Sequence, residues 1–145
     1  VSGHTIGHIA FYFEQSNLLF TADSLMALGC GRLFEGDAVQ MWESLSKLKA
    51  LNPDLTVCSG HEYTAENGRF AITIEPGNTA LQSRILEITR KRSRNIPTVP
   101  STLKEELETN PFLRPESAEI RDNLGMKNNT DAEVFAEIRK RKDKF

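Results

Sequence analysis

Hydrophobic and polar positions follow two different spacings along the chain, with short apolar runs near the N-terminus and helical repeats after residue 61. Aromatic and branched residues fill positions 8–13, and a second apolar run covers residues 18–21. Gln15, Ser16 and Asn17 lie between these runs and favour a turn, so the pattern predicts a β-hairpin. The second strand is expected to end at residues 22–24, where a glycine-containing loop begins.

A helix and another strand are predicted to follow this loop. Apolar residues recur at helical spacing over residues 39–51, Asp37 can cap the first turn, and Pro53 is expected to end the helix. The short apolar run at residues 55–58 predicts a buried strand with His61 at its exit. A strand, a helix and a strand in this order form the basic unit of an α/β layered fold.

The remainder of the chain has a helix-forming composition. Helices are predicted over residues 65–74, 79–94, 102–108 and 132–144, separated by prolines, and the two prolines in residues 96–100 predict an extended segment. We therefore expect two parts, an α/β part over residues 1–64 and a mostly helical part over residues 65–145.

Composition excludes several classes of protein. The 145 residues are 39% hydrophobic and 26% charged, which is typical of a globular protein with a core and not of a disordered chain. No apolar stretch is long enough to span a membrane. The net charge of −2 predicts no general attraction to nucleic acid or anionic lipid. The only two cysteines, Cys30 and Cys58, lack the CxxC spacing of a redox motif and indicate a reducing, cytoplasmic setting.

Three residues in loops after predicted strands or glycines have side chains that bind metals. They are His4, Asp23 and His61, and together they would supply two imidazoles and a carboxylate to a zinc or iron site. Each has a structural alternative: a polar loop residue for the histidines, and a helix cap or turn for Asp23. For His8, a structural hydrogen bond is the better interpretation.

Four strings resemble, in order and spacing, the second half of glyoxalase II, the hydroxyacylglutathione hydrolases of the metallo-β-lactamase superfamily. They are GHTIGH at residues 3–8, FTADSL at 20–25, GCGRLFEG at 29–36 and GHEYT at 60–64. The likeness continues through residues 97–102 and 110–114 to Arg139 and Lys142, so it covers nearly the whole chain. It implies the second half of an αββα sandwich followed by a mostly helical substrate-binding domain.

The resemblance also implies a reaction. His4 would ligate one divalent metal ion, His61 a second, and Asp23 would bridge both and act as the catalytic carboxylate, with zinc expected ahead of iron or manganese. A hydroxide bridging the metals would hydrolyse the thioester of S-(2-hydroxyacyl)glutathione. The substrate of similar enzymes is S-D-lactoylglutathione, which gives D-lactate and glutathione in methylglyoxal detoxification.

Five positions match the family's substrate contacts. Arg32 stands where the family often has Lys, and Phe34 where it usually has Tyr. Tyr63 stands where the family has a Tyr beside the glutathione. Arg139 and Lys142 match a basic pair that binds the glycine carboxylate of glutathione through charge-assisted hydrogen bonds. The structural alternative for this pair is a solvated face at the end of the last helix.

Three departures qualify the resemblance. Phe34 lacks the hydroxyl of the usual Tyr, which predicts weaker glutathione binding. Ala22 replaces a usual Gly and is expected at negative φ. The HxHxDH motif that supplies the other metal ligands does not occur, and the sequence begins with Val1. We expect either that the first half lies upstream or on another chain, or that these residues are an inactive fragment or a glutathione-binding module.

Overall fold

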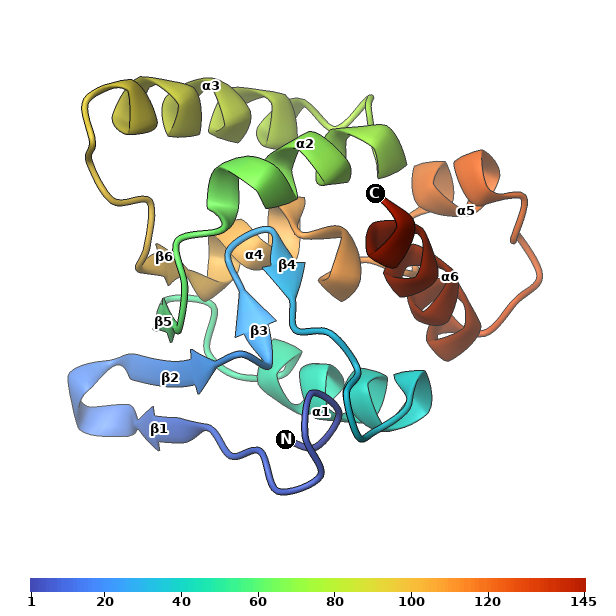
Figure 1. Ribbon diagram of the computed structural model, residues 1–145, viewed down its shortest axis with the longest axis horizontal. Coiled ribbons are helices and arrows are strands. Elements are labelled where there is room, and N and C mark those ends of the chain that lie inside the picture. Colours follow the sequence, from blue (N-terminus) through green and yellow to red (C-terminus); the bar gives the residue numbers. More distant parts are fainter.

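The computed structural model describes all residues from 1 to 145 and contains one mixed sheet, one small hairpin and six α-helices (Figure 1). The sheet has the order β1-β2-β5-β6, in which β2 and β5 are parallel and the other pairs antiparallel. Its strands are β1 (Phe11–Phe13), β2 (Leu18–Ala22), β5 (Thr56–Ser59) and β6 (Ser101–Thr102). Strands β3 (Leu25–Met26) and β4 (Gly29–Cys30) pair with each other.

The helix between β2 and β5 confirms the predicted strand–helix–strand unit. Helix α1 (Ala38–Lys49) is capped by Asp37, whose carboxylate accepts from the Gln40 N–H at 2.9 Å. Met41, Leu45 and Leu48 form its buried face. The helix ends at the C-cap Ala50, before the expected Pro53, and the Ala50 N–H donates to the carbonyls of Ser46 and Leu48.

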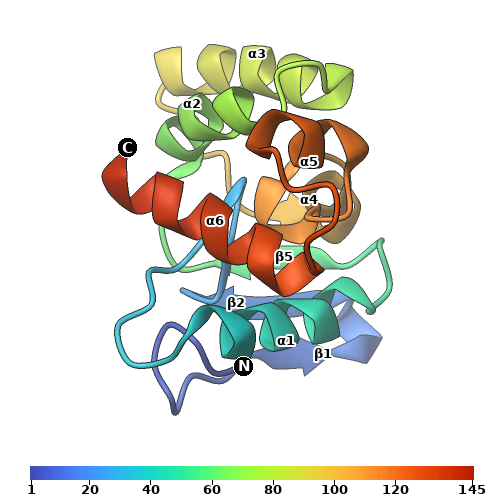
Figure 2. The same cartoon turned by 90° about the vertical axis from the view of Figure 1, so that its right-hand side faces the viewer.

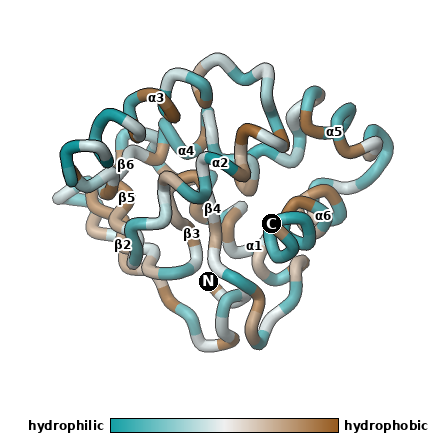
Figure 3. The backbone as a smooth tube through the Cα atoms, turned by 45° about the horizontal axis from the view of Figure 1, so that its top comes forward, coloured by the Kyte–Doolittle hydropathy of each residue, from teal (hydrophilic) through white to brown (hydrophobic).

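The second part is helical, as predicted. Its helices are α2 (Thr64–Ile74), α3 (Thr79–Ser93), α4 (Leu103–Thr109), α5 (Ala118–Leu124) and α6 (Asp131–Lys144). Helix α6 returns across the molecule and lies beside α1 (Figures 1 and 2). In Figure 3, helix α6 contains both hydrophobic and hydrophilic residues, as expected for a helix with one face in the core. None of the helices combines the length and the apolar character that crossing a bilayer requires.

One hydrophobic core joins the two parts. Leu19 and Val57 from the sheet pack in the same cluster as Leu45 from α1 and Phe70 and Phe135 from the helical part. A smaller cluster around Leu28 and Leu81 lies between the β3–β4 turn and α3. The α/β class is therefore confirmed, and the sheet part depends on the helical part for its packing.

The two faces of the sheet differ in their burial. Leu19 and Val57 are neighbours in register on the face that packs into the core, and both are fully buried. Phe11, Phe13 and Phe20 point to the opposite face, where all three remain exposed. Alternate residues of a strand point to opposite faces, so the aromatic pattern that predicted the hairpin also created this exposed apolar surface.

Several short elements differ from the predictions. Strand β1 begins at Phe11 and not at residue 8, and the loop expected after Asp23 contains β3 and β4. Strand β6 and helix α5 were not predicted. Two-residue strands show no alternation, and α5 buries only Ile120, so neither produces a hydrophobic period. Residues 96–100 form neither helix nor strand, as the prolines predicted.

Candidate functional site

A cavity of about 490 Å³ lies between the loops after β2 and β5, the β3–β4 hairpin and helices α2 and α6. All eight residues assigned to the site from the sequence line this cavity. Because these residues range from His4 to Lys142, the fold brings together groups from both parts of the chain.

Asp23 stands at the centre of the three predicted metal ligands. Its Oδ1 lies 3.1 Å from Nε2 of His61, and its Oδ2 lies 3.8 Å from Nε2 of His4. The carboxyl ends of the parallel strands β2 and β5 meet at one edge of the sheet, which brings Asp23 and His61 together. The structure thus juxtaposes the three side chains that the sequence singled out.

Two glycines allow this close approach. A Cβ added to Gly60 would lie 2.8 Å from Asp23 Oδ1, and one added to Gly31 would lie 2.8 Å from His4 Nδ1. Both distances are shorter than van der Waals contact. A larger residue at Gly60 would therefore displace the Asp23 side chain, and one at Gly31 would displace the His4 ring and the backbone carbonyl of Asp23.

His4 is held in a defined orientation. Its Nδ1 donates a hydrogen bond of 2.8 Å to the Arg32 carbonyl. Because Nδ1 is used in this bond, the other ring nitrogen, Nε2, is the one that faces Asp23. The ring also contacts Phe34 at a centroid distance of 4.9 Å, and His61 stacks on Tyr63 at 4.8 Å.

One carboxylate oxygen of the site lacks a hydrogen-bond donor. Oδ1 of Asp23 is buried, and its contact with Nε2 of His61 at 3.1 Å does not have the geometry of a hydrogen bond. A buried carboxylate oxygen without a donor is unfavourable unless a cation or another donor compensates it. Together with the two imidazoles, it forms a donor set that suits zinc and similar divalent ions.

This chain by itself supplies only part of a metal centre. No group of three or more His, Cys, Asp or Glu side chains has the arrangement needed to hold a metal ion. The contacts are instead two pairs, His4–Asp23 and His61–Asp23, and the two histidines are joined only through the Asp23 carboxylate. The donor types therefore fit a divalent metal, while the number and arrangement of ligands within these residues do not complete its coordination.

Ala22 corrects one expectation. It has φ of 46°, in the left-handed region, where a negative φ was expected. The pairing of β2 with β5 is irregular between Phe20 and Ala22, and the Ala22 carbonyl accepts from the Gly60 N–H at 3.0 Å. This irregularity turns the chain so that Asp23 faces the cavity, at the cost of a backbone conformation that favours glycine.

Arg139 is a buried residue and not part of a solvated helix face. It is only 4% exposed, its Nη1 donates to the Cys30 carbonyl at 2.9 Å, and its Nε donates to Asp143 at 3.0 Å. The guanidinium also lies 5.2 Å from the centre of the Phe112 ring. Arg139 thus fixes α6 against β4 at the wall of the cavity.

The other predicted substrate contacts are more open. Arg32 and Tyr63 are exposed at the cavity mouth, and Phe34 is 68% exposed. Lys142 is largely covered, and burial lowers the pKa of its ammonium group while Glu66 opposes that shift. The lining of the cavity therefore combines cationic and aromatic groups with the two imidazoles and Asp23.

The two thiols do not form a redox pair. Both cysteines are free, and burial raises the pKa of Cys30 to about 11. Burial also raises the pKa of Cys58. Because the thiolate is the reactive form, these environments make both residues less reactive.

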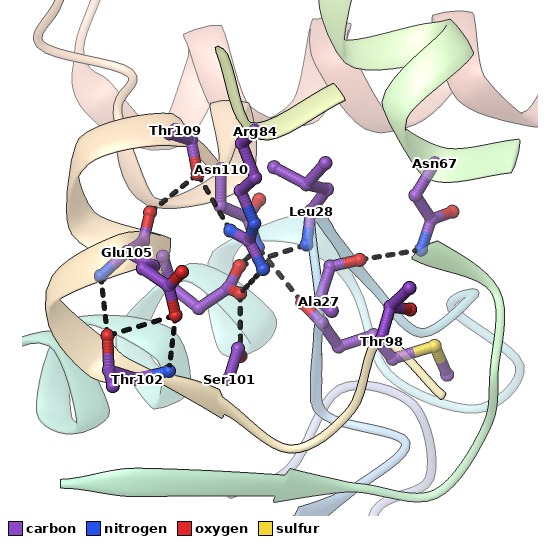
Figure 4. A network of polar contacts seen from close by, with 12 residues as sticks. Ala27, Leu28, Asn67, Arg84, Thr98, Ser101, Thr102, Glu105, Thr109 and Asn110 are labelled. Atoms are coloured by element: carbon purple, nitrogen blue, oxygen red, sulfur yellow. Dashed lines mark hydrogen bonds and ion pairs between the residues drawn. The ribbon is translucent and has the colours of Figure 1, made fainter. Parts of the chain in front are cut away.

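Sequence reasoning missed two cavity residues on α2, Glu66 and Asn67. Asn67 donates to the Ala27 carbonyl at 3.1 Å and so supports the β3–β4 turn (Figure 4). Glu66 lies three residues after Tyr63, on the first turn of a predicted helix. This three-residue spacing was the available signal that Tyr63 and Glu66 face the same side of the helix.

A buried polar network from the helical part supports the same turn (Figure 4). The amide of Asn110 donates to the carbonyls of Met26 at 3.1 Å and Gly29 at 3.0 Å. The backbone N–H of Leu28 donates to Glu106 at 2.9 Å, and Arg84 pairs with the same carboxylate. The hairpin that connects Asp23 to Arg32 is therefore fixed from outside the sheet.

Comparisons with known proteins agree with this arrangement. Residues 62–145 match the family described as hydroxyacylglutathione hydrolase C-terminus. The chain belongs to the hydroxyacylglutathione hydrolase family. Residues 1–61 match the metallo-β-lactamase superfamily, so the resemblance and the fold class inferred from the sequence are confirmed. This superfamily implies divalent metal ions in general terms.

Curated relatives carry the same name. The chain is 62% identical to a hydroxyacylglutathione hydrolase of Roseobacter denitrificans and 59% identical to those of Cereibacter sphaeroides and Methylococcus capsulatus, in each case over all 145 residues. It spans 57% of the length of each of these relatives. The chain therefore corresponds to a portion of these longer relatives.

Proposed function

We propose that the full-length protein containing these residues hydrolyses S-(2-hydroxyacyl)glutathione, with S-D-lactoylglutathione as substrate and D-lactate and glutathione as products. The observation that carries this proposal is the contact of Asp23 with both imidazoles, at the wall of a cavity that also holds the basic residues. We place the reaction in the cytoplasm, as part of methylglyoxal detoxification, and the two free thiols are compatible with that compartment.

The metal-ligating roles follow from the donor atoms. His4 and His61 would each offer Nε2 to one of two divalent ions, and the two oxygens of Asp23 would serve both, with zinc as the first candidate. When bound, the metals supply an activated water and stabilise the developing negative charge on the carbonyl oxygen. The remaining ligands would come from the length that the relatives have beyond these residues.

The other residues of the cavity would bind and orient the substrate. Lys142 and Arg139 would attract the glycine carboxylate, and Arg32 would contribute a further positive charge at the mouth. Tyr63 stacks on His61 and would bring its hydroxyl beside the glutathione. With the peptide held there, water attacks the thioester carbon, the carbon–sulfur bond breaks and glutathione leaves as a thiolate.

The full-length protein tests this proposal directly. It should contain divalent metal in a fixed ratio and release thiol from S-D-lactoylglutathione. Asp23→Asn should lower the metal content and reduce thiol release by about ten- to a hundredfold, since a coordinating anion is lost. Asp54→Asn is the control, because Asp54 is exposed and lies outside the cavity. A folded full-length protein that neither bound metal nor cleaved the thioester would contradict the proposal.

A second function applies to these 145 residues taken alone. The absence of a complete three-ligand group favours a glutathione-binding module without hydrolysis. Titration of the chain with glutathione, followed by calorimetry, separates the two cases. Binding that Lys142→Ala weakens, together with no thiol release from the thioester, supports the module. Hydrolysis by the purified chain would exclude it.

A further inference from the structure

Beside the basic residue Lys142 the cavity contains one acidic residue whose role is not explained by metal binding. Glu66 lines the cavity on the first turn of α2, and its Oε1 lies 3.7 Å from Nζ of Lys142. The side chain of Glu66 is 60% exposed, whereas that of Lys142 is 13% exposed. The carboxylate therefore covers a cation that the cavity presents to an incoming ligand.

Lys142 is poorly solvated apart from this contact. Its ammonium group lies 5.6 Å from the centre of the Phe70 ring and 5.4 Å from that of Phe145. Burial, together with the nearby charges of Arg139 and Arg32, disfavours its charged form, while Glu66 favours it. A desolvated cation interacts strongly with an anion, so a change of its anionic partner should be felt in ligand binding.

We propose that Glu66 determines the affinity and the charge preference of the cavity, because its carboxylate competes with the carboxylate of the ligand for Lys142. The inference rests on the proposed function, in which the ligand is glutathione or its S-acyl derivative. A ligand carboxylate that reaches Lys142 must approach Glu66 or displace it, and two like charges then repel each other. Glutathione is consequently held less tightly than the basic residues alone would hold it, which favours release of the product.

The opposite role for Glu66 is well defined and makes a different prediction. If Glu66 only positioned Lys142 for the ligand, its removal would disorder the ammonium group and weaken binding. In the competing role, its removal frees the ammonium group and strengthens binding. The sign of the change in affinity therefore distinguishes the two.

The chain offers a matched control. Glu87 on α3 pairs with Lys91 at 2.9 Å, and its side chain is 59% exposed, close to the value for Glu66. Glu87 does not line the cavity. Glu66→Gln and Glu87→Gln thus make the same change in net charge and each removes an exposed carboxylate from one lysine, but only the first affects the cavity.

The experiment is a titration of the protein with S-methylglutathione, measured by calorimetry. Glu66→Gln should lower the dissociation constant about two- to fivefold, the range that ion pairs at a protein surface support, and Glu87→Gln should leave it unchanged. The gain should shrink as salt is raised to about 1 M, where the screening length falls to about 3 Å. An unchanged or higher dissociation constant for Glu66→Gln would overturn the inference.

A second ligand separates this inference from the proposed function. S-Methylglutathione with its glycine carboxylate converted to the amide keeps its γ-glutamyl end but has no glycine carboxylate for Glu66 to repel, so Glu66→Gln should bind it no better than the unmodified protein does. An equal gain for both ligands would also overturn the inference. If the unmodified protein binds neither ligand, the proposed function itself fails, and the competition at Lys142 fails with it.

Discussion

The sheet part and the helical part of this chain treat their polar groups in opposite ways. In the helical part, the buried carboxylates of Glu75 and Glu106 are each surrounded by donors from several elements. In the sheet part, Asp23 keeps a buried oxygen without a donor, and Ala22 beside it adopts a left-handed conformation. The first arrangement stabilises the fold, and the second leaves a group available for chemistry.

The same contrast holds for apolar groups. The helical part buries Phe112 and Phe135 completely, whereas the sheet part exposes Phe11, Phe13 and Phe20 on one face. The helical part also extends its network into the sheet part at the turn of the β3–β4 hairpin. The helical part thus supplies stability, and the sheet part supplies the reactive loops. Each of the following substitutions changes either the helical part or the sheet part.

The largest effect is expected at Glu106. This carboxylate is fully buried, pairs with Arg84, and accepts from Ser101 at 2.8 Å and from the Leu28 N–H at 2.9 Å. Glu106→Ala leaves the guanidinium of Arg84 buried without its partner, so the free energy of unfolding should fall by about 3–5 kcal/mol. Urea unfolding followed by circular dichroism measures it.

An exposed pair provides the control for that experiment. Lys127 and Asp122 lie 3.1 Å apart with most of both side chains in solvent, so Asp122→Ala should cost no more than about 1 kcal/mol. A loss at Glu106 of similar size would show that the network does not stabilise the fold more than a surface ion pair does.

The next largest effect concerns Glu75 and pH. Burial disfavours its charge, but hydrogen bonds from Arg114, Ser117 and Asn78 outweigh burial and hold its pKa below the ordinary value of 4.5. A depressed pKa in the folded state contributes stability that is fully present above pH 4.5 and is lost as the pH falls through the folded value.

Glu75→Gln should therefore lower the free energy of unfolding by about 1.5–3 kcal/mol at pH 7, because hydrogen bonds to a charged group are lost. The difference between the two proteins should become smaller as the pH falls below 4.5. Urea titrations at pH 7, 5 and 3.5 measure this convergence. A difference that stayed constant over this range would show that the charge of Glu75 does not contribute.

A stabilising change is expected at Ala22. Glycine adopts a φ of 46° without the steric cost that Ala22 bears, so Ala22→Gly should raise the free energy of unfolding by about 1 kcal/mol. Ala80→Gly in the exposed turn of α3 should instead lower it by about 0.5–1 kcal/mol. Thermal unfolding of both variants measures whether each substitution raises or lowers the free energy of unfolding. If Ala22→Gly destabilised the protein as Ala80→Gly does, the strain assigned to this loop would be wrong.

The elements that sequence reasoning placed correctly are those whose signals are local. Asp37 and the apolar spacing of Met41, Leu45 and Leu48 define α1 within one segment. The meeting of Asp23 with His61 follows from the rule that parallel strands end at the same edge of a sheet.

The features that sequence reasoning missed depend on distant partners. Arg139 belongs to a basic run that resembles a solvated helix end, and only the carbonyl of Cys30, more than a hundred positions away, explains its burial. The left-handed Ala22 depends on pairing with Gly60 across the strands. No periodicity along the chain carries such information, because it reports which face is buried and not what lies opposite.

The smallest effect is expected for Phe34, a residue of the sheet part that would contact the substrate. Phe34 is largely exposed, lines the cavity and contacts the His4 ring, and it lacks a hydroxyl group. Phe34→Tyr keeps the ring and adds one donor, so the dissociation constant for glutathione should fall about two- to tenfold, the equivalent of one net hydrogen bond. Phe13→Tyr adds the same hydroxyl to the exposed sheet face away from the cavity and should leave binding unchanged. Calorimetry on both variants decides the matter: equal affinities for Phe34→Tyr and the unmodified protein would mean that the hydroxyl at this position does not reach the ligand.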